Sequence, residues 1–162
     1  MTGTKSRFKF VSVCIHGVGE KFPAPFNLIT KNMIRKLEHP ERASQLIDLT
    51  GINYGNASPT DIDGFLEIKN KLFVFLEFKN ENAPPIGYGQ RTALERVVDA
   101  LHQSGKVSLA IIGQHNTAHT EIVNGSESKA LEIRWRGQWL SLKNKNYTVR
   151  DCVNQAMAYA FT

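Results

Sequence analysis

The segment Leu72–Lys79 (LFVFLEFK) constrains the fold of this 162-residue chain more than any other. Its residues are almost all apolar and rich in phenylalanine, which is typical of a central β-strand covered on both faces. Such a strand needs a packing layer above it and another below it. The chain is therefore expected to contain a covered sheet, and Glu77 and Lys79 place two charges at the end of its central strand.

Hydrophobic periodicity elsewhere predicts further strands and helices. The predicted strands are Phe8–Ile15, Asp61–Ile68, Leu72–Lys79, Val107–Ile112, Leu131–Trp135 and Gln138–Leu142. The predicted helices are Leu28–Leu37, Glu41–Leu49, a segment opened by Gln90 and ended by Gly105, and a C-terminal helix capped by Thr148. The order of helix, strand hairpin, helix and strand indicates an α/β domain with a mixed sheet, and the length suits one domain over residues 1–162.

Composition limits the compartment and the class of partner. Twenty basic and fifteen acidic residues give a net charge of +5, which suits an anionic partner such as nucleic acid. Cys14 and Cys152 form neither a disulfide framework nor a CxxC metal pair, which favours a reduced, intracellular protein. No apolar run approaches the roughly 20 residues of a membrane span, and no signal-peptide pattern opens the chain. We therefore expect a cytoplasmic protein with no membrane partner.

The charges at the end of the central strand predict a site. Glu77 and Lys79 lie two residues apart on a strand, so their side chains leave the same face. Asp63, on the preceding strand, returns toward Glu77 if the two strands pair antiparallel. Two converging carboxylates suit Mg²⁺ or Mn²⁺, and an adjacent lysine can hold a water or offset phosphate charge. The pattern favours phosphodiester hydrolysis over the simpler interpretation, a surface ion pair.

The order Pro59-Thr60-Asp61-Ile62-Asp63-Gly64 and then Glu77-Phe78-Lys79 resembles the PD-(D/E)xK nuclease superfamily over about Ser58–Ile112. The resemblance implies a restriction-endonuclease-like fold, a mixed sheet flanked by helices. It also implies dependence on Mg²⁺ or Mn²⁺ and cleavage of DNA or, less often, RNA.

By the same resemblance, Asp63 and Glu77 are metal ligands and Lys79 is the catalytic lysine. Asp61 is an alternative ligand to Asp63, since alternate strand residues share a face. Gln90, at the start of the next helix, is a candidate for placing the nucleophile or the scissile phosphate. Glu38 and Glu41 are candidates for the first-helix glutamate that many relatives use as a further ligand, or are solvated charges at helix ends.

The expected function is therefore a Mg²⁺-dependent endonuclease acting on DNA. Junction or end processing is favoured over sequence-specific cleavage, because no appended recognition domain is recognised, and a homodimer would suit such substrates. Compactness and the resemblance suggest a phage or mobile-element protein acting in the host cytoplasm. A catalytically inactive nucleic-acid-binding module with the same fold and an RNA-directed nuclease are the alternatives.

Other residues have less specific patterns. We expect Lys69, Lys71 and Arg91 to contact phosphates close to the metal, and Lys143, Lys145 and Arg150 form a second basic cluster. The HxxxH spacing of His115 and His119 falls in a predicted loop, which favours solvated side chains over zinc binding. Trp135 and Trp139 flank a predicted hairpin turn, where they pack across the strands or stack on a base.

Overall fold

The computed structural model describes residues 50–53, 55 and 57–162. Residues 60–162 belong to one compact unit, and residues 50–59, with the short 3-10 helix η2 (Thr50–Ile52), belong to another. The predicted strand and helices before residue 50, together with Glu38 and Glu41, lie outside the described residues. The single domain spanning residues 1–162 stays a prediction.

Five strands of the larger unit form one sheet in the order β1-β2-β3-β4-β5. They are β1 (Gly64–Ile68), β2 (Leu72–Asn80), β3 (Val107–His115), β4 (Lys129–Trp135) and β5 (Gln138–Ser141). β2 and β3 are parallel, whereas the other neighbouring strands pair antiparallel. β2 has a hydrogen-bonded strand on each side, as its apolar composition predicts.

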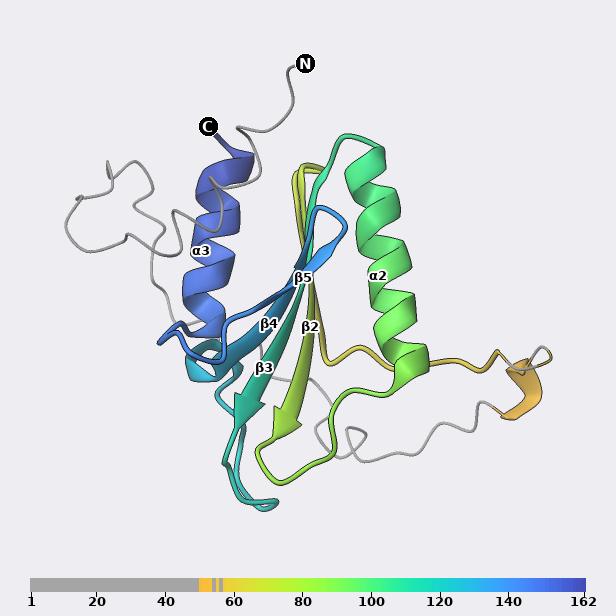
Figure 1. Ribbon diagram of the computed structural model, residues 1–162, viewed down its shortest axis with the longest axis vertical. Coiled ribbons are helices and arrows are strands. Elements are labelled where there is room, and N and C mark those ends of the chain that lie inside the picture. Colours follow the sequence, from red (N-terminus) through yellow and green to blue (C-terminus); the bar gives the residue numbers. More distant parts are fainter. Residues whose placement is uncertain (1–49, 54, 56) are drawn as a thin grey trace, which may run out of the picture. The chain divides into compact units, whose positions relative to one another are not determined.

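Helices cover both faces of this sheet (Figure 1). α2 (Tyr88–Gln103) makes the crossover that the parallel β2–β3 pair requires, and α3 (Val149–Ala160) follows β5. A capping box begins α3: the Thr148 side chain accepts from the Asp151 N–H, and the Asp151 carboxylate accepts from the Thr148 N–H. The predicted α/β class, a mixed sheet flanked by helices, is confirmed. None of the helices in the described part of the chain has the length and hydropathy of a membrane span.

The sheet face under α3, called the α3 face below, holds the larger hydrophobic core. Its buried side chains are Leu72, Val74, Leu109, Ile111, Ala130, Ile133, Trp135, Leu142, Val149, Cys152 and Ala156. They come from β2, β3, β4, the loop after β5 and α3, so packing on this face joins elements from across the unit. This burial supplies most of the hydrophobic stabilisation of the unit.

The opposite face, called the α2 face below, holds a smaller apolar cluster of Phe75, Leu94, Val98 and Ala110. Toward the carboxyl end of β2, polar side chains replace apolar ones on this face. Trp135 and Trp139 lie on opposite faces, Trp135 in the larger core and Trp139 beside the smaller cluster. The two rings therefore do not pack against each other, although Trp135 does pack across the sheet with Leu109, its partner on β3.

Two tight turns fix the register of the hairpins. Lys69 and Asn70 have φ angles of 51° and 53°, and Arg136 and Gly137 have φ angles of 47° and 76°. Two successive positive φ values are the signature of a type I′ turn, whose twist matches that of paired strands. The turn at Arg136-Gly137 confirms the predicted hairpin of β4 and β5.

The first of these turns lies far from the charged end of β2. Lys69 and Lys71 lie at the amino end of β2, whereas Glu77 lies six residues beyond Lys71. At about 3.3 Å per residue, a strand of that length separates them by roughly 20 Å. The prediction that Lys69 and Lys71 lie close to the metal ligands is therefore wrong.

Candidate active site

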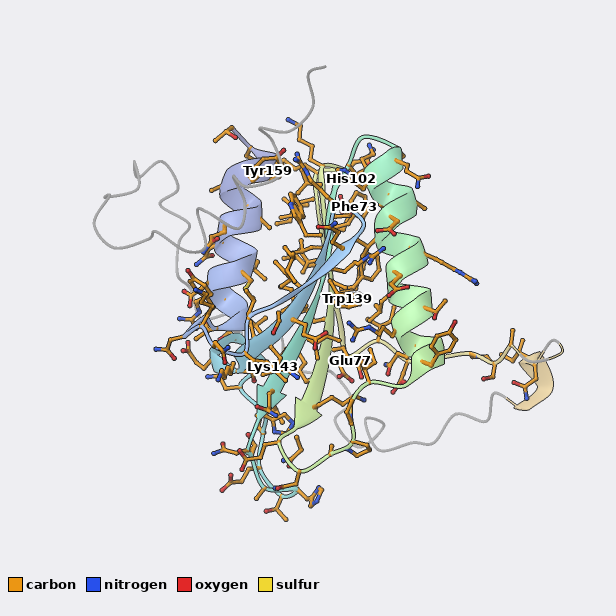
Figure 2. All side chains as sticks on the ribbon, viewed as in Figure 1. Phe73, Glu77, His102, Trp139, Lys143 and Tyr159 are labelled. Carbon is orange, nitrogen blue, oxygen red and sulfur yellow. The ribbon has the colours of Figure 1, made fainter. Side chains whose placement is uncertain are left out.

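Glu77 and Lys79 form an ion pair on the α2 face, and Figure 2 shows Glu77 on the side of the sheet covered by α2. Glu77 is 3% exposed, and it is the one charged residue of the described part that is buried. The Nζ of Lys79 lies 2.8 Å from Oε1 of Glu77. A buried carboxylate is costly without such a partner, so the pair accounts for the tolerance of a charge on a central strand.

The carboxylates around Lys79 keep it charged. Its hydrogen bond to Glu77 raises the pKa of Lys79 above the ordinary value of 10.5, and burial opposes this increase. The negative charges of Glu77, Asp63 and Asp61 raise the pKa of Lys79 further. Lys79 is therefore a cation at neutral pH, surrounded by the carboxylates that the sequence analysis selected.

Asp63 reaches the same point from the other strand of the hairpin. Gly64 pairs with Leu76, so continuing this register places Asp63 opposite Glu77. The predicted strand from Asp61 nevertheless begins only at Gly64. Here the Asp63 carboxylate accepts the N–H of Phe78 at 2.7 Å, in place of a backbone carbonyl of the ladder. The donor of this hydrogen bond, Phe78, is the residue between Glu77 and Lys79, so the Asp63 carboxylate lies next to their ion pair.

Gln90 connects the first turn of α2 to the segment before β1. Its Nε2 donates to the backbone carbonyl of Asp61 at 3.1 Å. This hydrogen bond holds the segment that leads to Asp63 against the helix. The structure thus brings together all five residues selected from the sequence: Asp61, Asp63, Glu77, Lys79 and Gln90.

The donor set fits a hard divalent cation. Asp63 and Glu77 offer carboxylate oxygens, which Mg²⁺ and Mn²⁺ prefer. In residues 50–53, 55 and 57–162, no group of three or more His, Cys, Asp or Glu side chains is placed to bind a metal. Mg²⁺ commonly uses one or two carboxylates and keeps several waters, so a pair of carboxylates is sufficient.

Phe78 joins this site to the core on the other face. Its N–H is held by Asp63, whereas its ring packs on the α3 face against Gly113 and Gly125. A Cβ at either glycine would lie 2.7 Å from a ring atom of Phe78. Any larger residue at these positions would displace the ring. The position of the N–H that Asp63 accepts is therefore fixed by packing on the face away from Glu77.

A polar network that the sequence analysis did not predict adjoins the site. Glu132 lies in the same cross-strand row as Glu77, with Ile112 of β3 between them. Nη2 of Arg91 donates to Oε2 of Glu132 at 2.8 Å, and the guanidinium carbon lies 4.2 Å from the Trp139 ring centroid. Arg91 therefore attaches α2 to β4 and β5, and its contact with a phosphate stays a prediction. Glu132 stands between the apolar residues Leu131 and Ile133 of β4, and this pattern was the sequence signal that could have indicated a polar side chain facing α2.

Trp139 completes this network from β5. Its Nε1 donates to Oε1 of Glu95 at 2.6 Å, and Figure 2 shows the ring between the sheet and α2. Of the second basic cluster, Lys143 lies 4.0 Å from Glu132, and Arg150 pairs with Glu127 at 2.7 Å. The Arg91–Glu132 and Trp139–Glu95 contacts, which both reach α2 from the sheet, hold the first turns of that helix over β4 and β5.

His115 lies at the end of β3, where it pairs with Asn80, and is not in the predicted loop. β3 extends past the predicted end at Ile112 because β2 continues to Asn80 beside it. His119 does lie in the loop that follows.

The chain matches no protein-family model, no curated protein and no solved structure. Its function is therefore inferred from the side chains of the site and their positions.

Proposed function

We propose that this protein is a divalent-metal-dependent nuclease of the PD-(D/E)xK type that hydrolyses phosphodiester bonds in DNA. One observation carries the proposal. The buried Glu77 pairs with Lys79 at 2.8 Å, and Asp63 accepts the N–H of the residue between them. A buried ion pair adds little stability compared with apolar side chains of similar size. A second carboxylate beside the pair is better explained by metal and phosphate chemistry than by stability.

In this proposal Asp63 and Glu77 hold Mg²⁺ or Mn²⁺. When bound, such a cation lowers the pKa of a coordinated water and polarises a phosphoryl oxygen. Lys79, kept charged by Glu77, orients the attacking water or offsets charge on the scissile phosphate. Gln90 acts as a positioning residue, because its amide holds the segment that carries Asp63.

The restriction-endonuclease-like fold is part of the same proposal. The β1–β2 hairpin, the crossover helix α2 and the parallel strand β3 support it. The proposal also includes structure-selective cleavage of junctions or ends, a homodimeric state and action in the cytoplasm.

The direct test is a panel of labelled duplex, single-stranded, flap, four-way-junction and RNA substrates with Mg²⁺, Mn²⁺ or EDTA. We expect DNA cleavage with either metal and none in EDTA. Glu77→Gln keeps the shape of the side chain and removes its charge, so cleavage should fall at least about a hundredfold. Glu121→Gln, at an exposed carboxylate in the loop after β3, is the matched control and should cleave at the wild-type rate.

Each other outcome contradicts a stated part of the proposal. Cleavage in EDTA would exclude the metal-dependent reaction, and wild-type cleavage by Glu77→Gln would exclude this site. Cleavage of RNA alone would establish the RNA-directed alternative. Binding of DNA without cleavage in any metal would establish the inactive binding module.

A further inference from the structure

A polar pocket of about 390 Å³ opens at the carboxyl ends of β2 and β3. Its walls include side chains from the loop after β2, the end of β3, the η3 turn (Gly125–Glu127) and the start of β4. Those used in the argument below are Glu81, Gln114, His115, Asn124, Glu127 and Lys129. No residue of this pocket belongs to the ion pair or to the carboxylates of the proposed active site.

The pocket lies beside that site. Across the parallel β2–β3 pair, Lys79 is in register with Gln114, and Asn80 is in register with His115. Neighbouring strands are about 4.8 Å apart, so the wall of the pocket begins about one strand spacing from Lys79. The proposed active site and the pocket thus share the carboxyl ends of β2 and β3, within reach of neighbouring nucleotides of one strand.

The walls are held in place by their own hydrogen bonds. The N–H of Glu81 donates to the His115 carbonyl at 2.8 Å, and Arg150 holds the Glu127 carboxylate at 2.7 Å. Nδ1 of His115 accepts the N–H of Thr117 at 3.2 Å, which leaves Nε2–H as the donor of the ring. Walls arranged before binding reduce the entropy that a ligand must lose.

The chemistry of the walls excludes several classes of ligand. The lining has no aliphatic side chain, so it offers little to an apolar molecule. Its two carboxylates, Glu81 and Glu127, outnumber its one ammonium group, Lys129, which disfavours a phosphate. Glu127 is already paired with Arg150 at 2.7 Å, and Lys129 adds a positive charge to the lining, so the two carboxylates are less suited to a metal than those of the proposed active site. What remains is a neutral ligand with several donors and acceptors.

A nucleobase has this chemistry. The amide of Gln114 presents a donor and an acceptor, as needed for bidentate pairing with adenine, and carboxylates accept from the amino group of cytosine. Asn124 adds an amide whose oxygen accepts from Ser126 Oγ at 2.9 Å and whose NH₂ group can donate to a base. An imidazole ring can also stack on a base. We propose that this pocket binds one unpaired nucleobase that carries an exocyclic amino group, from the nucleotide next to the scissile phosphate.

This inference rests on the proposed nuclease function for the identity of its ligand. It deepens that function, because a base can enter the pocket only where it is not stacked in a duplex. Substrates with unpaired nucleotides, such as flaps, junctions and frayed ends, meet this condition. Uninterrupted duplex would have to unpair first.

The test measures binding to the full chain in EDTA, where no cleavage is expected. Cytidine, adenosine and thymidine are titrated separately, and the side-chain amide resonances of Gln114 and Asn124 are followed by NMR. We expect cytidine and adenosine to shift both resonances and to bind at least about fivefold more tightly than thymidine. Gln114→Ala should weaken cytidine binding at least about fivefold. Gln103→Ala, an exposed amide at the far end of α2, is the matched control and should bind normally.

The outcomes separate this inference from the proposed function. Equal binding of the three nucleosides, or unshifted resonances of Gln114 and Asn124, would overturn the base pocket even if the protein cleaves DNA. Selective binding of cytidine and adenosine by a protein that cleaves no nucleic acid would support the pocket and refute the nuclease. The wild-type titration decides the question even if Gln114→Ala does not fold.

Discussion

The two faces of the sheet differ in the side chains they bury. Nearly every buried residue of the α3 face is apolar, and these residues connect α3 with β2, β3 and β4. On the α2 face, a small apolar cluster gives way to Glu77, Lys79 and the Arg91–Glu132 pair. The difference shows that one face supplies enough hydrophobic burial for the other to carry charged groups. The predictions below test this division, from the largest expected effect to the smallest.

Substitutions at two adjacent residues of β3 allow the contributions of the α3 face and the α2 face to the free energy of unfolding to be compared. Leu109 and Ser108 are both fully buried, Leu109 on the α3 face and Ser108 under α2, where its Oγ donates to the Val98 carbonyl at 2.7 Å. Leu109→Ala should lower the free energy of unfolding by about 2–5 kcal/mol, because it leaves a cavity. Ser108→Ala removes one hydrogen bond and should cost about 1–3 kcal/mol. Urea denaturation measures both, and a larger loss for Ser108→Ala would contradict the division.

The two aspartates before β1 test which carboxylate of the α2 face acts in cleavage. Asp63→Asn keeps an oxygen that can accept the Phe78 N–H, so the fold should persist while cleavage falls at least about a hundredfold. Asp61→Asn retains the backbone carbonyl that Gln90 binds, and its rate should fall less than about tenfold. Single-turnover cleavage with Mg²⁺ measures both rates. The reverse order would identify Asp61 as the ligand.

Lysines at opposite ends of the strands test where nucleic acid lies. Lys129 begins β4 and Lys143 follows β5, at the strand ends nearest Glu77. Lys69 and Lys71 lie at the opposite strand ends, beside the amino end of β2. Replacing Lys129 and Lys143 with alanine should reduce the slope of log affinity against log salt by about one to two units. The double alanine variant of Lys69 and Lys71 makes the same change in net charge and should keep the wild-type slope. Fluorescence anisotropy measures DNA binding by the two variants in EDTA at several salt concentrations. A reduced slope for the Lys69 and Lys71 variant alone would place DNA at the amino end of β2.

The dependence of the free energy of unfolding on pH, at alkaline pH, tests the ion pair of Glu77 and Lys79. Because the pKa of Lys79 is raised on folding, its contribution to stability is fully present below about pH 10.5 and is lost as the pH rises through the folded pKa. The stability difference between wild type and Lys79→Met should therefore narrow above about pH 10.5. The change should be small, since the Lys79 side chain is 30% exposed. Urea denaturation from pH 8 to pH 11.5 measures it, and a constant difference would show that the pair does not stabilise the fold.

Patterns within single segments predicted much of this fold. The apolar run of β2 placed it inside the sheet, and its period of two placed Glu77 and Lys79 on one face. Thr148 was correctly predicted as the cap of α3. These features depend on local sequence, which is why they could be predicted without knowing which strands are neighbours.

Features that depend on strand order were missed or misplaced. Glu132 lies in the same cross-strand row as Glu77 because the sheet places β3 between β2 and β4. No local sequence pattern reveals this order of strands. The late start of β1 coincides with a long-range hydrogen bond, from the Phe78 N–H to the Asp63 carboxylate, that no local pattern reports. The distance of Lys69 from Glu77, in contrast, follows from the length of β2 and the direction of the hairpin, both of which are local features.

The packing of Phe78 against Gly113 and Gly125 has a consequence for heat inactivation. The ring belongs to the larger core, and the N–H of the same residue holds Asp63. When thermal motion releases the ring, the aspartate loses its anchor at the same moment. The proposed cleavage activity and the folded structure should therefore be lost over one temperature interval, with no range in which an intact but inactive protein accumulates.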